Sequence, residues 1–410
     1  GAQKYPETLP ELRRILQDQE DPANTAHLIR TVAALDGSWD VTAYLTHPDP
    51  EISGAAAMTL LHHNDPDKQA LGDRYLNGLL DSGTGTQRIQ ALQLIGEMSV
   101  TRFSGRVMDL YLEPDEGVRR NALLTMGLLK TPQDIRRLVG IYLETDRVSD
   151  IYHALQLAGE SPLPWIREKL ESGSCTQMQR RRLYNLMGRI ATAGAMELME
   201  TALRDYPADR AVLLELLSHL HFRAGDQQQA FRILIEEALE RTAGHIFRLS
   251  FLQQESKQYQ ILFDAMQLEV GSLRDQLLSL FSFLYDNEKI HRIRSGFLLG
   301  TKESIANALE LVVMEVPREY SAPFVDLFEP GSLKEKSERL RKHYRAHTIT
   351  LDHLVREILE AGNRTFTDWT KSCLLYRLDQ PRQYQKLVLP YLEADDPILR
   401  ETARFIIPAD

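Results

Sequence analysis

Apolar residues recur along the chain at the three- and four-residue spacing that places them on one face of an α-helix. Leu123, Met126 and Leu129 form one such stripe, and a second helix-like segment, residues 102–113, precedes it. No long alternation of apolar and polar residues, which is typical of a β-strand, interrupts this pattern. We therefore predict an all-α fold of short helices joined by turns.

Four segments of the chain repeat one pattern around a glycine, and successive glycines are 31, 32 and 29 residues apart. In three of the segments an alanine lies five residues before the glycine, whereas the fourth has Arg182 near that place. Two short helices in about 30 residues form the unit of an α-solenoid. The glycines are Gly96, Gly127, Gly159 and Gly188, and the alanines are Ala91, Ala122 and Ala154.

Helix starts within these repeats share their turn chemistry. Asp49-Pro50 and Asp396-Pro397 combine an N-cap aspartate with proline at the first helical position, and Asp115-Glu116 provides a similar acidic start. A small residue follows each start, where neighbouring helices approach closely. This pattern resembles the HEAT and HEAT-like repeat family. The resemblance implies an α-solenoid of helical hairpins in a right-handed superhelical array.

The quality of the repeat divides the chain into four regions. We expect N-terminal capping helices over residues 1–44 and HEAT-like repeats over 45–225. Over 226–300 the helices look longer and the small residues no longer recur at the repeat position, so we expect irregular longer helices that continue the solenoid. HEAT-like repeats resume over 301–410. No Gly/Ser-rich linker separates the regions, which favours one continuous array.

Composition indicates a globular protein, since 43% of the residues are hydrophobic and 26% are charged. Two cysteines, Cys175 and Cys373, cannot form a disulfide framework, so we expect a reducing, cytoplasmic compartment. The 48 basic and 58 acidic residues give a formal charge of -10, which weighs against nucleic acid as a partner.

Sequence motifs for catalysis are absent: there is no phosphate-binding loop, HExxH pair, GxSxG elbow or CxxC pair. Gly83 and Gly85 are interpreted as a turn between helices. His62-His63 with Asp65 and Asp67 could be imagined as metal ligands, but adjacent histidines point to different sides of a helix, and we interpret them as a capped helix end. We expect a protein that is not an enzyme, with no catalytic residue, cofactor, metal or small-molecule site.

Two basic clusters stand out from the acidic background, one within residues 119–182 and a second over residues 334–345. In the second cluster the alternation of charge predicts a solvated helix with the pairs Glu335–Arg339 and Glu338–Arg341. The first is a candidate ridge for an acidic partner segment or a headgroup, because successive repeats can align its arginines along one solenoid face. The ridge consists of Arg119, Arg120, Arg180, Arg181 and Arg182.

The C-terminal part carries a more specific resemblance. Residues 284–330, with Leu284-Tyr285-Asp286 and the helix Asn307-Ala308-Leu309-Glu310-Leu311, resemble the soluble HEAT region of bacterial ATP/ADP (nucleotide) translocase-like proteins of the major facilitator type. Trp369, Cys373-Leu374-Leu375-Tyr376 and residues 397–403 match as well. The translocase membrane domain and the cyclic-nucleotide-binding-like domain of that family are not in this chain. Because the chain starts at Gly1 without an initiator Met, we interpret it as an excised cytosolic portion from the inner membrane's cytosolic side.

The resemblance and the missing motifs favour a non-catalytic, regulatory protein-interaction module attached to a nucleotide-transporter-like bacterial membrane protein, with a protein partner of unknown identity. One alternative is a soluble scaffold or adaptor without a membrane parent. Another is a nucleic-acid enzyme of the HEAT-like DNA-glycosylase type. That enzyme needs a basic groove with aromatic platforms, whereas Trp39, Trp165 and Trp369 are dispersed and the net charge is acidic.

Overall fold

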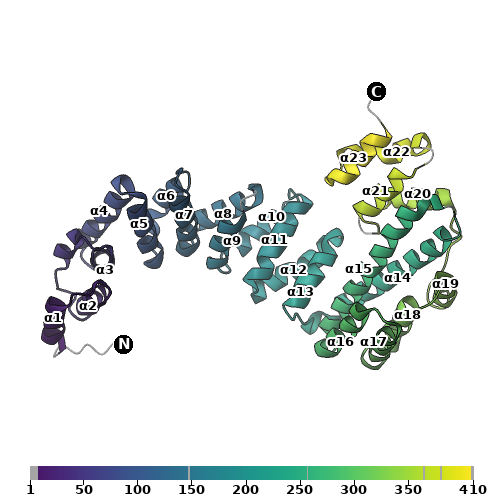
Figure 1. Cartoon of the computed structure of the whole chain (residues 1–410), viewed down its shortest axis with the longest axis horizontal. Helices are drawn as coiled ribbons and strands as arrows, with labels where there is room; N and C mark the ends of the chain where they lie inside the picture. The colour runs from purple at the N-terminus through teal and green to yellow at the C-terminus, as the bar shows by residue number, and fades with distance from the viewer. Residues whose placement is uncertain (1–7, 146–147, 256, 363–364, 379–380, 408–410) are drawn as a thin grey trace. The chain divides into compact units, whose positions relative to one another are not determined.

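The computed structural model describes residues 8–145, 148–255, 257–362, 365–378 and 381–407, and over these residues it is helical without any β-strand (Figure 1). The prediction of an all-α fold is therefore confirmed. The helices form two compact units, the first running to Ser172 and the second beginning at Gly173. This division falls inside the region 45–225 that the sequence pattern groups together.

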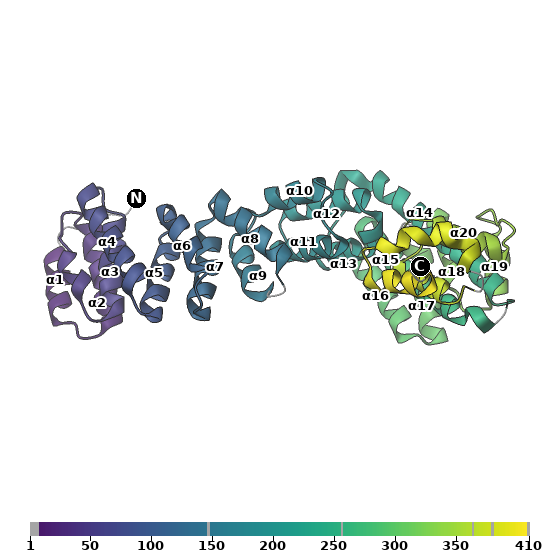
Figure 2. The ribbon, with the colours of Figure 1, turned by 90° about the horizontal axis from the view of Figure 1, so that it is seen from above.

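The first unit consists of ten α-helices in two rows. The helices α2, α3, α5, α7 and α9 each pack on the next in one row, and α4, α6 and α8 pack against that row (Figure 2). The helices are α1 (Leu9–Asp18), α2 (Pro22–Leu35), α3 (Pro50–Leu61), α4 (Pro66–Ser82), α5 (Gly85–Glu97), α6 (Ser104–Leu110), α7 (Glu116–Leu129), α8 (Pro132–Glu144), α9 (Val148–Leu157) and α10 (Leu163–Glu171).

Three helices of the structure begin at the predicted residues. Asp49, Asp115 and Asp396 are the N-caps of α3, α7 and α23, and the carboxylate of each accepts a hydrogen bond from a backbone N–H of the first turn. For Asp115 the acceptor is Oδ1 and the donor is the N–H of Val118, at 3.0 Å. An N-terminal N–H has no partner inside the helix, so these side chains satisfy groups that would otherwise be unpaired.

Close helix packing explains two of the repeated glycines. A Cβ atom on Gly127 of α7 would lie 2.2 Å from the carbonyl oxygen of Ala154 in α9, far inside van der Waals contact. A Cβ atom on Gly96 of α5 would lie 2.8 Å from Cδ1 of Leu128 in α7. The backbone contact makes glycine necessary at position 127, whereas at position 96 the end of the flexible Leu128 side chain would have to move.

The second unit is built around two 25-residue helices, α14 and α15, which pack on each other. Around them, α18 and α19 contact α14, whereas α13, α16 and α21 contact α15. The helices are α11 (Gln177–Ile190), α12 (Ala193–Asp205), α13 (Arg210–His219), α14 (Gln228–Leu252), α15 (Gln260–Leu284), α16 (Asn287–Leu299), α17 (Lys302–Glu315), α18 (Arg318–Phe328), α19 (Leu333–Leu340), α20 (Leu351–Glu360), α21 (Asp368–Tyr376), α22 (Gln385–Val388) and α23 (Pro397–Ile406).

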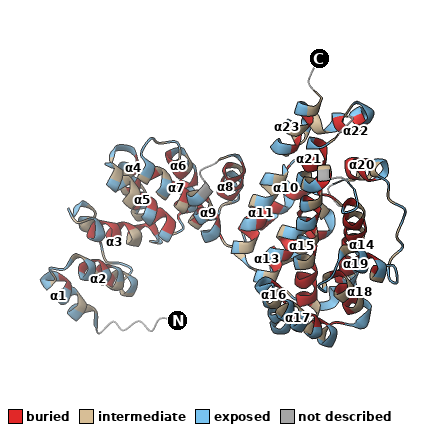
Figure 3. Ribbon diagram, turned by 45° about the vertical axis from the view of Figure 1, so that its right-hand side comes forward, coloured by how far each residue is buried: buried red, intermediate tan, exposed pale blue. Residues whose placement is uncertain are grey.

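Burial in the second unit is concentrated on this central pair (Figure 3). Every residue of α15 from Leu277 to Phe283 is buried, so about two turns near the C-terminal end of this helix are enclosed on all sides. Phe283 and Phe231 lie edge to face with their ring centroids 5.6 Å apart, which joins α15 to α14. Although both helices are long enough, no helix among the described residues has the apolar stretch needed to cross a membrane.

The second basic cluster does not form the predicted pairs within one helix. The carboxylate of Glu335 instead accepts a hydrogen bond from the backbone N–H of Ser332 in a capping box. Arg339 reaches out of α19 to Glu329 at 2.9 Å and to Asp326 of α18 at 3.4 Å. Arg341 follows the last residue of the helix. The predicted pairs Glu335–Arg339 and Glu338–Arg341 are not among the ion pairs of the described residues; Glu335 caps the helix and Arg339 contacts other acids, although the charge of Arg339 still helps to lower the pKa of Glu335.

Candidate functional site

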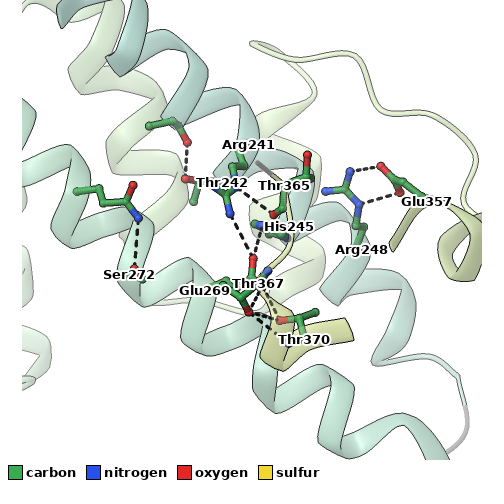
Figure 4. A network of polar contacts seen from close by, with 12 residues as sticks. Arg241, Thr242, His245, Arg248, Glu269, Ser272, Glu357, Thr365, Thr367 and Thr370 are labelled. Atoms are coloured by element: carbon green, nitrogen blue, oxygen red, sulfur yellow. Dashed lines mark hydrogen bonds and ion pairs between the residues drawn. The ribbon is translucent and has the colours of Figure 1, made fainter. Parts of the chain in front are cut away.

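A network of charged and polar side chains lies between α14, α15, α20 and the segment leading into α21 (Figure 4). Three residues of α14 contribute to it: Arg241, His245 and Arg248. Their spacing of four and three residues places them on one face of the helix. Glu269 of α15 and Glu357 of α20 are the acidic members.

Glu269 is the centre of the network and is buried. Its Oε1 accepts hydrogen bonds from the backbone N–H of Thr367 at 2.7 Å, from the Thr367 hydroxyl at 2.8 Å and from the Thr370 hydroxyl. Its Oε2 lies 3.1 Å from Nε2 of His245 and 3.6 Å from Nη2 of Arg241. One carboxylate of α15 therefore holds the N-terminus of α21 with one oxygen and faces α14 with the other.

These contacts determine the charge states in the network. Burial by itself would raise the pKa of Glu269, but the contacts with His245, Thr370 and the Thr367 backbone outweigh it and hold the pKa at about 2. Complete burial lowers the pKa of His245 despite the nearby carboxylate. At neutral pH Glu269 is thus ionised and His245 is neutral, so Arg241 supplies the positive charge that balances Glu269.

Arg248 and Phe366 extend the network towards α20. The guanidinium of Arg248 donates two hydrogen bonds to the carboxylate of Glu357, one from Nε at 3.0 Å and one from Nη2. Its Cζ atom lies 5.2 Å from the ring centroid of Phe366, whose ring also meets His245 edge to face. Nε of Arg241 donates to the carbonyl oxygen of Thr365 at 3.0 Å. The network therefore attaches α20 and the start of α21 to the central helix pair.

A cleft of about 470 Å³ adjoins the network, and Arg241, Arg248 and Thr365 belong to both. Leu214 of α13, Leu234 and Phe247 of α14 and Leu280 of α15 supply an apolar floor. The polar lining is mainly cationic, with two glutamates on α14. The charged side chains are Arg210, Glu237, Glu240, Arg241, Arg248 and Arg345, and the segment between α19 and α20 adds Tyr344 and His347.

Two arginines of the predicted ridge have structural contacts. Arg119 and Arg180 both lie eight residues before a repeat glycine, Gly127 and Gly188 respectively. Nη2 of Arg119 lies 4.0 Å from Oε1 of Glu116. Arg180 is tied more firmly, since its Nε atom donates to Oδ2 of the buried Asp209 at 2.6 Å and its guanidinium lies over the ring of Tyr206.

Two other ridge arginines point to solvent. Arg120 and Arg181 lie seven residues before the same glycines, and both are exposed. Arg120 contacts Asp150 of α9 at 3.3 Å while 56% of its side chain stays accessible. Arg182 is half-buried. Arg119 and Arg120 belong to the first unit and Arg180, Arg181 and Arg182 to the second, so the structure groups them as two sets, and their alignment along one face stays a prediction.

Arg120 does not line the groove of the first unit, but it has the same position in its repeat as a residue that does. Ile89 of α5 lies seven residues before Gly96, as Arg120 lies before Gly127, and Ile89 lines this groove. The groove has a volume of about 530 Å³ and runs across α2, α3 and α5. Apolar and polar side chains alternate in it, and they include Arg30, Glu51, Met58, Gln90, Gln93, Leu94 and Glu97.

The histidine pair of the first unit is engaged at a helix end. His62 is the C-cap of α3. Nε2 of His63 lies 2.9 Å from the carbonyl oxygen of Gly37, and its Nδ1 accepts a hydrogen bond from the backbone N–H of Asp65. In the part of the chain that the structure describes, no group of three or more His, Cys, Asp or Glu side chains is placed to hold a metal ion.

The polar network was not predicted, although two of its residues leave a trace in the sequence. Glu269 follows Leu262 and Met266 and precedes Leu273 at helical spacing, so it is an acid within an apolar stripe. His245 stands at a comparable place before Leu249 in α14. A charged residue on a buried face requires a partner, but that partner, Thr370, is 101 residues away in sequence.

Comparisons with known proteins do not assign this arrangement. No protein-family model and no curated protein matches the chain. Among solved structures, an engineered protein determined by the Northeast Structural Genomics Consortium is similar at 14% identity with a TM-score of 0.23, and the match covers 97% of this chain and 98% of that chain. A TM-score this low gives no basis for transferring a fold or a function.

Proposed function

We propose that the chain is a HEAT-like α-solenoid module that binds a partner protein through the exposed face of its helix rows and carries out no chemistry itself. The layering of the first unit supports this, because each helix of a row packs on the next through small residues. Rows of this kind present a long surface with the same helix face repeated in every layer.

The groove across α2, α3 and α5 is the observation that carries the proposal. Its mixed lining, with Met58 and Leu94 beside Gln90 and Gln93, suits an extended polypeptide that presents both apolar and polar groups. Arg120 has the same repeat position as Ile89, on α7, and although it contacts Asp150 at 3.3 Å, 56% of its side chain stays accessible to a partner. We therefore expect the partner to offer acidic side chains near the groove.

A photo-crosslinking amino acid at position 93 of the full chain, expressed in its source cells, tests the proposal. Gln93 lines the groove, and position 167 on α10 provides a matched exposed control outside it. We expect a partner protein to be captured from position 93 and not from position 167. Capture should be lost in the variant Arg120→Glu and retained in Arg167→Glu. Equal capture from both positions, or capture that survives Arg120→Glu, would contradict the proposal.

The resemblance of residues 284–330 to the soluble region of nucleotide-translocase-like membrane proteins extends the proposal to a regulatory role beside a bacterial membrane transporter. The complete reading frame that encodes the chain tests this extension. A preceding block of apolar membrane helices is the expected result. A reading frame without such helices would contradict the extension and would favour a cytoplasmic scaffold with the same binding groove.

A further inference from the structure

We propose that the cleft beside the polar network is a binding site for a small organic anion, one with a carboxylate or phosphate group on an apolar body. This inference concerns the second unit only and does not depend on the proposed protein-binding groove. The cleft volume of about 470 Å³ is within the range of small-molecule sites.

Arg241 provides the first reason. Its side chain is largely buried, and its Nε is used by the carbonyl oxygen of Thr365. Its Nη2 forms an ion pair with Oε2 of Glu269 at 3.6 Å, which is too long for a hydrogen bond, and neither Nη atom makes a hydrogen bond with a described residue. A guanidinium with unused donors that lines a cleft is suited to bind an oxyanion with two parallel hydrogen bonds.

The other charges of the lining leave this role to Arg241 and Arg345. Arg210 is paired with Glu237 at 2.7 Å, and Arg248 donates to Glu357. Arg345 is exposed and makes no ion pair within the described part of the chain. Inside the cleft Arg241 therefore offers hydrogen-bond donors while its charge also faces Glu269, and Arg345 offers a charge without an ion pair in the described part of the chain; Glu240 is the remaining acid of the lining.

The floor of the cleft determines the rest of the ligand. Leu214, Leu234, Phe247 and Leu280 come from three helices and supply the apolar part of the lining, although each residue is largely buried. An inorganic anion would leave the accessible part of this apolar lining in contact with water, whereas an apolar body would cover it. Tyr344, from the segment between α19 and α20, also lines the cleft. The arrangement thus favours an amphipathic anion over a free inorganic ion.

Calorimetric titration of the full chain tests the site with four probes: 4-phenylbutyrate, phenyl phosphate, inorganic phosphate and the uncharged 4-phenylbutyramide. We expect saturable binding of at least one of the two organic anions. The amide and inorganic phosphate should bind about tenfold more weakly or not at all, since each lacks one of the two recognised groups.

Three variants locate the binding. Arg241→Gln and Arg345→Gln should each weaken the organic anion by about tenfold. Arg341→Gln, which changes an exposed arginine near the same segment but outside the cleft, should bind like the unaltered chain. If Arg241→Gln fails to fold, as judged by circular dichroism, the exposed Arg345 decides the result. Absence of saturable binding, binding of inorganic phosphate alone, or full affinity in Arg345→Gln would overturn the proposal.

Discussion

Nε of Arg180 lies 2.6 Å from Oδ2 of Asp209, a carboxylate whose side chain has no accessible surface. The hydroxyl of Tyr184 donates to the same oxygen at 3.1 Å, and burial together with this carboxylate raises the pKa of Tyr184. Arg180 is the cation of this cluster, so the charge of Asp209 is balanced by one residue. A residue that the sequence suggested for a binding ridge is therefore committed to the interior.

Arg180→Met should consequently destabilise the chain by about 3 kcal/mol, because it leaves the buried carboxylate of Asp209 without its cation. Urea unfolding monitored by circular dichroism measures the change. Arg181→Met is the matched control, since the neighbouring side chain is exposed, and its effect should stay within about 0.5 kcal/mol. Equal effects of the two variants would show that the Arg180–Asp209 pair contributes no specific stability.

Gly127→Ala should destabilise the packing of α7 on α9. The added methyl group would meet the backbone carbonyl of Ala154, which cannot move without displacing the whole helix, and we expect a loss of about 1–3 kcal/mol. Gly140→Ala in α8 provides the comparison, because no atom lies within 4 Å of the added Cβ. That variant should gain up to about 1 kcal/mol from helix propensity. Thermal melting of both variants measures the difference, and a neutral Gly127→Ala would disprove the close contact.

Glu269 should make folding sensitive to acid. Its pKa falls from the ordinary glutamate value of 4.5 to about 2 in the folded chain, so the unfolded chain binds the proton first as the pH is lowered. The stability contributed by Glu269 is complete above pH 4.5 and is lost as the pH falls towards 2, with a total of about 3 kcal/mol. The unfolding free energies of the unaltered chain and of Glu269→Gln should therefore converge over this interval. Parallel curves would exclude the proposed contacts of the carboxylate.

Protonation of His245 should also lower the stability of the folded chain, and at a higher pH than the protonation of Glu269. Its pKa is lowered from 6.5 by burial, so the folded state resists a proton that the unfolded state accepts. Stability should fall as the pH drops below 6.5, and His245→Gln should reduce this slope. Guanidinium unfolding at several pH values between 7 and 5 measures it. His347→Gln, which changes an exposed ring, should keep the original slope, and an unchanged slope in His245→Gln would contradict the prediction.

Local chemistry made much of the helical architecture predictable. The N-caps Asp49, Asp115 and Asp396 act on backbone groups within three residues, so the sequence around them contains all the information that fixes the helix start. The repeated glycines Gly96 and Gly127 were recognised by their spacing, and their physical role, close approach of neighbouring helices, follows from the same repeat. Short-range patterns of this kind need no knowledge of distant partners.

The candidate sites depend on distant partners and could not be predicted in the same way. Glu269 meets Thr367 and Thr370 across about 100 residues of sequence, and the cleft draws its lining from α13, α14, α15 and two connecting segments. Arg180 could not be separated from Arg181 without the position of Asp209, 29 residues away. Which of two adjacent arginines turns inward depends on the packing of neighbouring helices, and a single sequence does not contain that information explicitly.

The attachment of α21 through Glu269 has a further consequence for the identity of the fold. Well-packed apolar side chains of similar volume at positions 245, 269 and 370 could hold α21 as tightly, since replacing a whole buried charged network by apolar groups is often neutral or stabilising. Apolar contacts, however, lack direction, and they would allow α21 to slide or rotate on α15. The hydrogen bonds that Thr367 and Thr370 donate to Glu269 can form in only one position of α21. In this chain the buried carboxylate of Glu269 fixes the position at which α21 starts. An apolar replacement could raise the free energy of unfolding and still allow α21 to take several positions on α15.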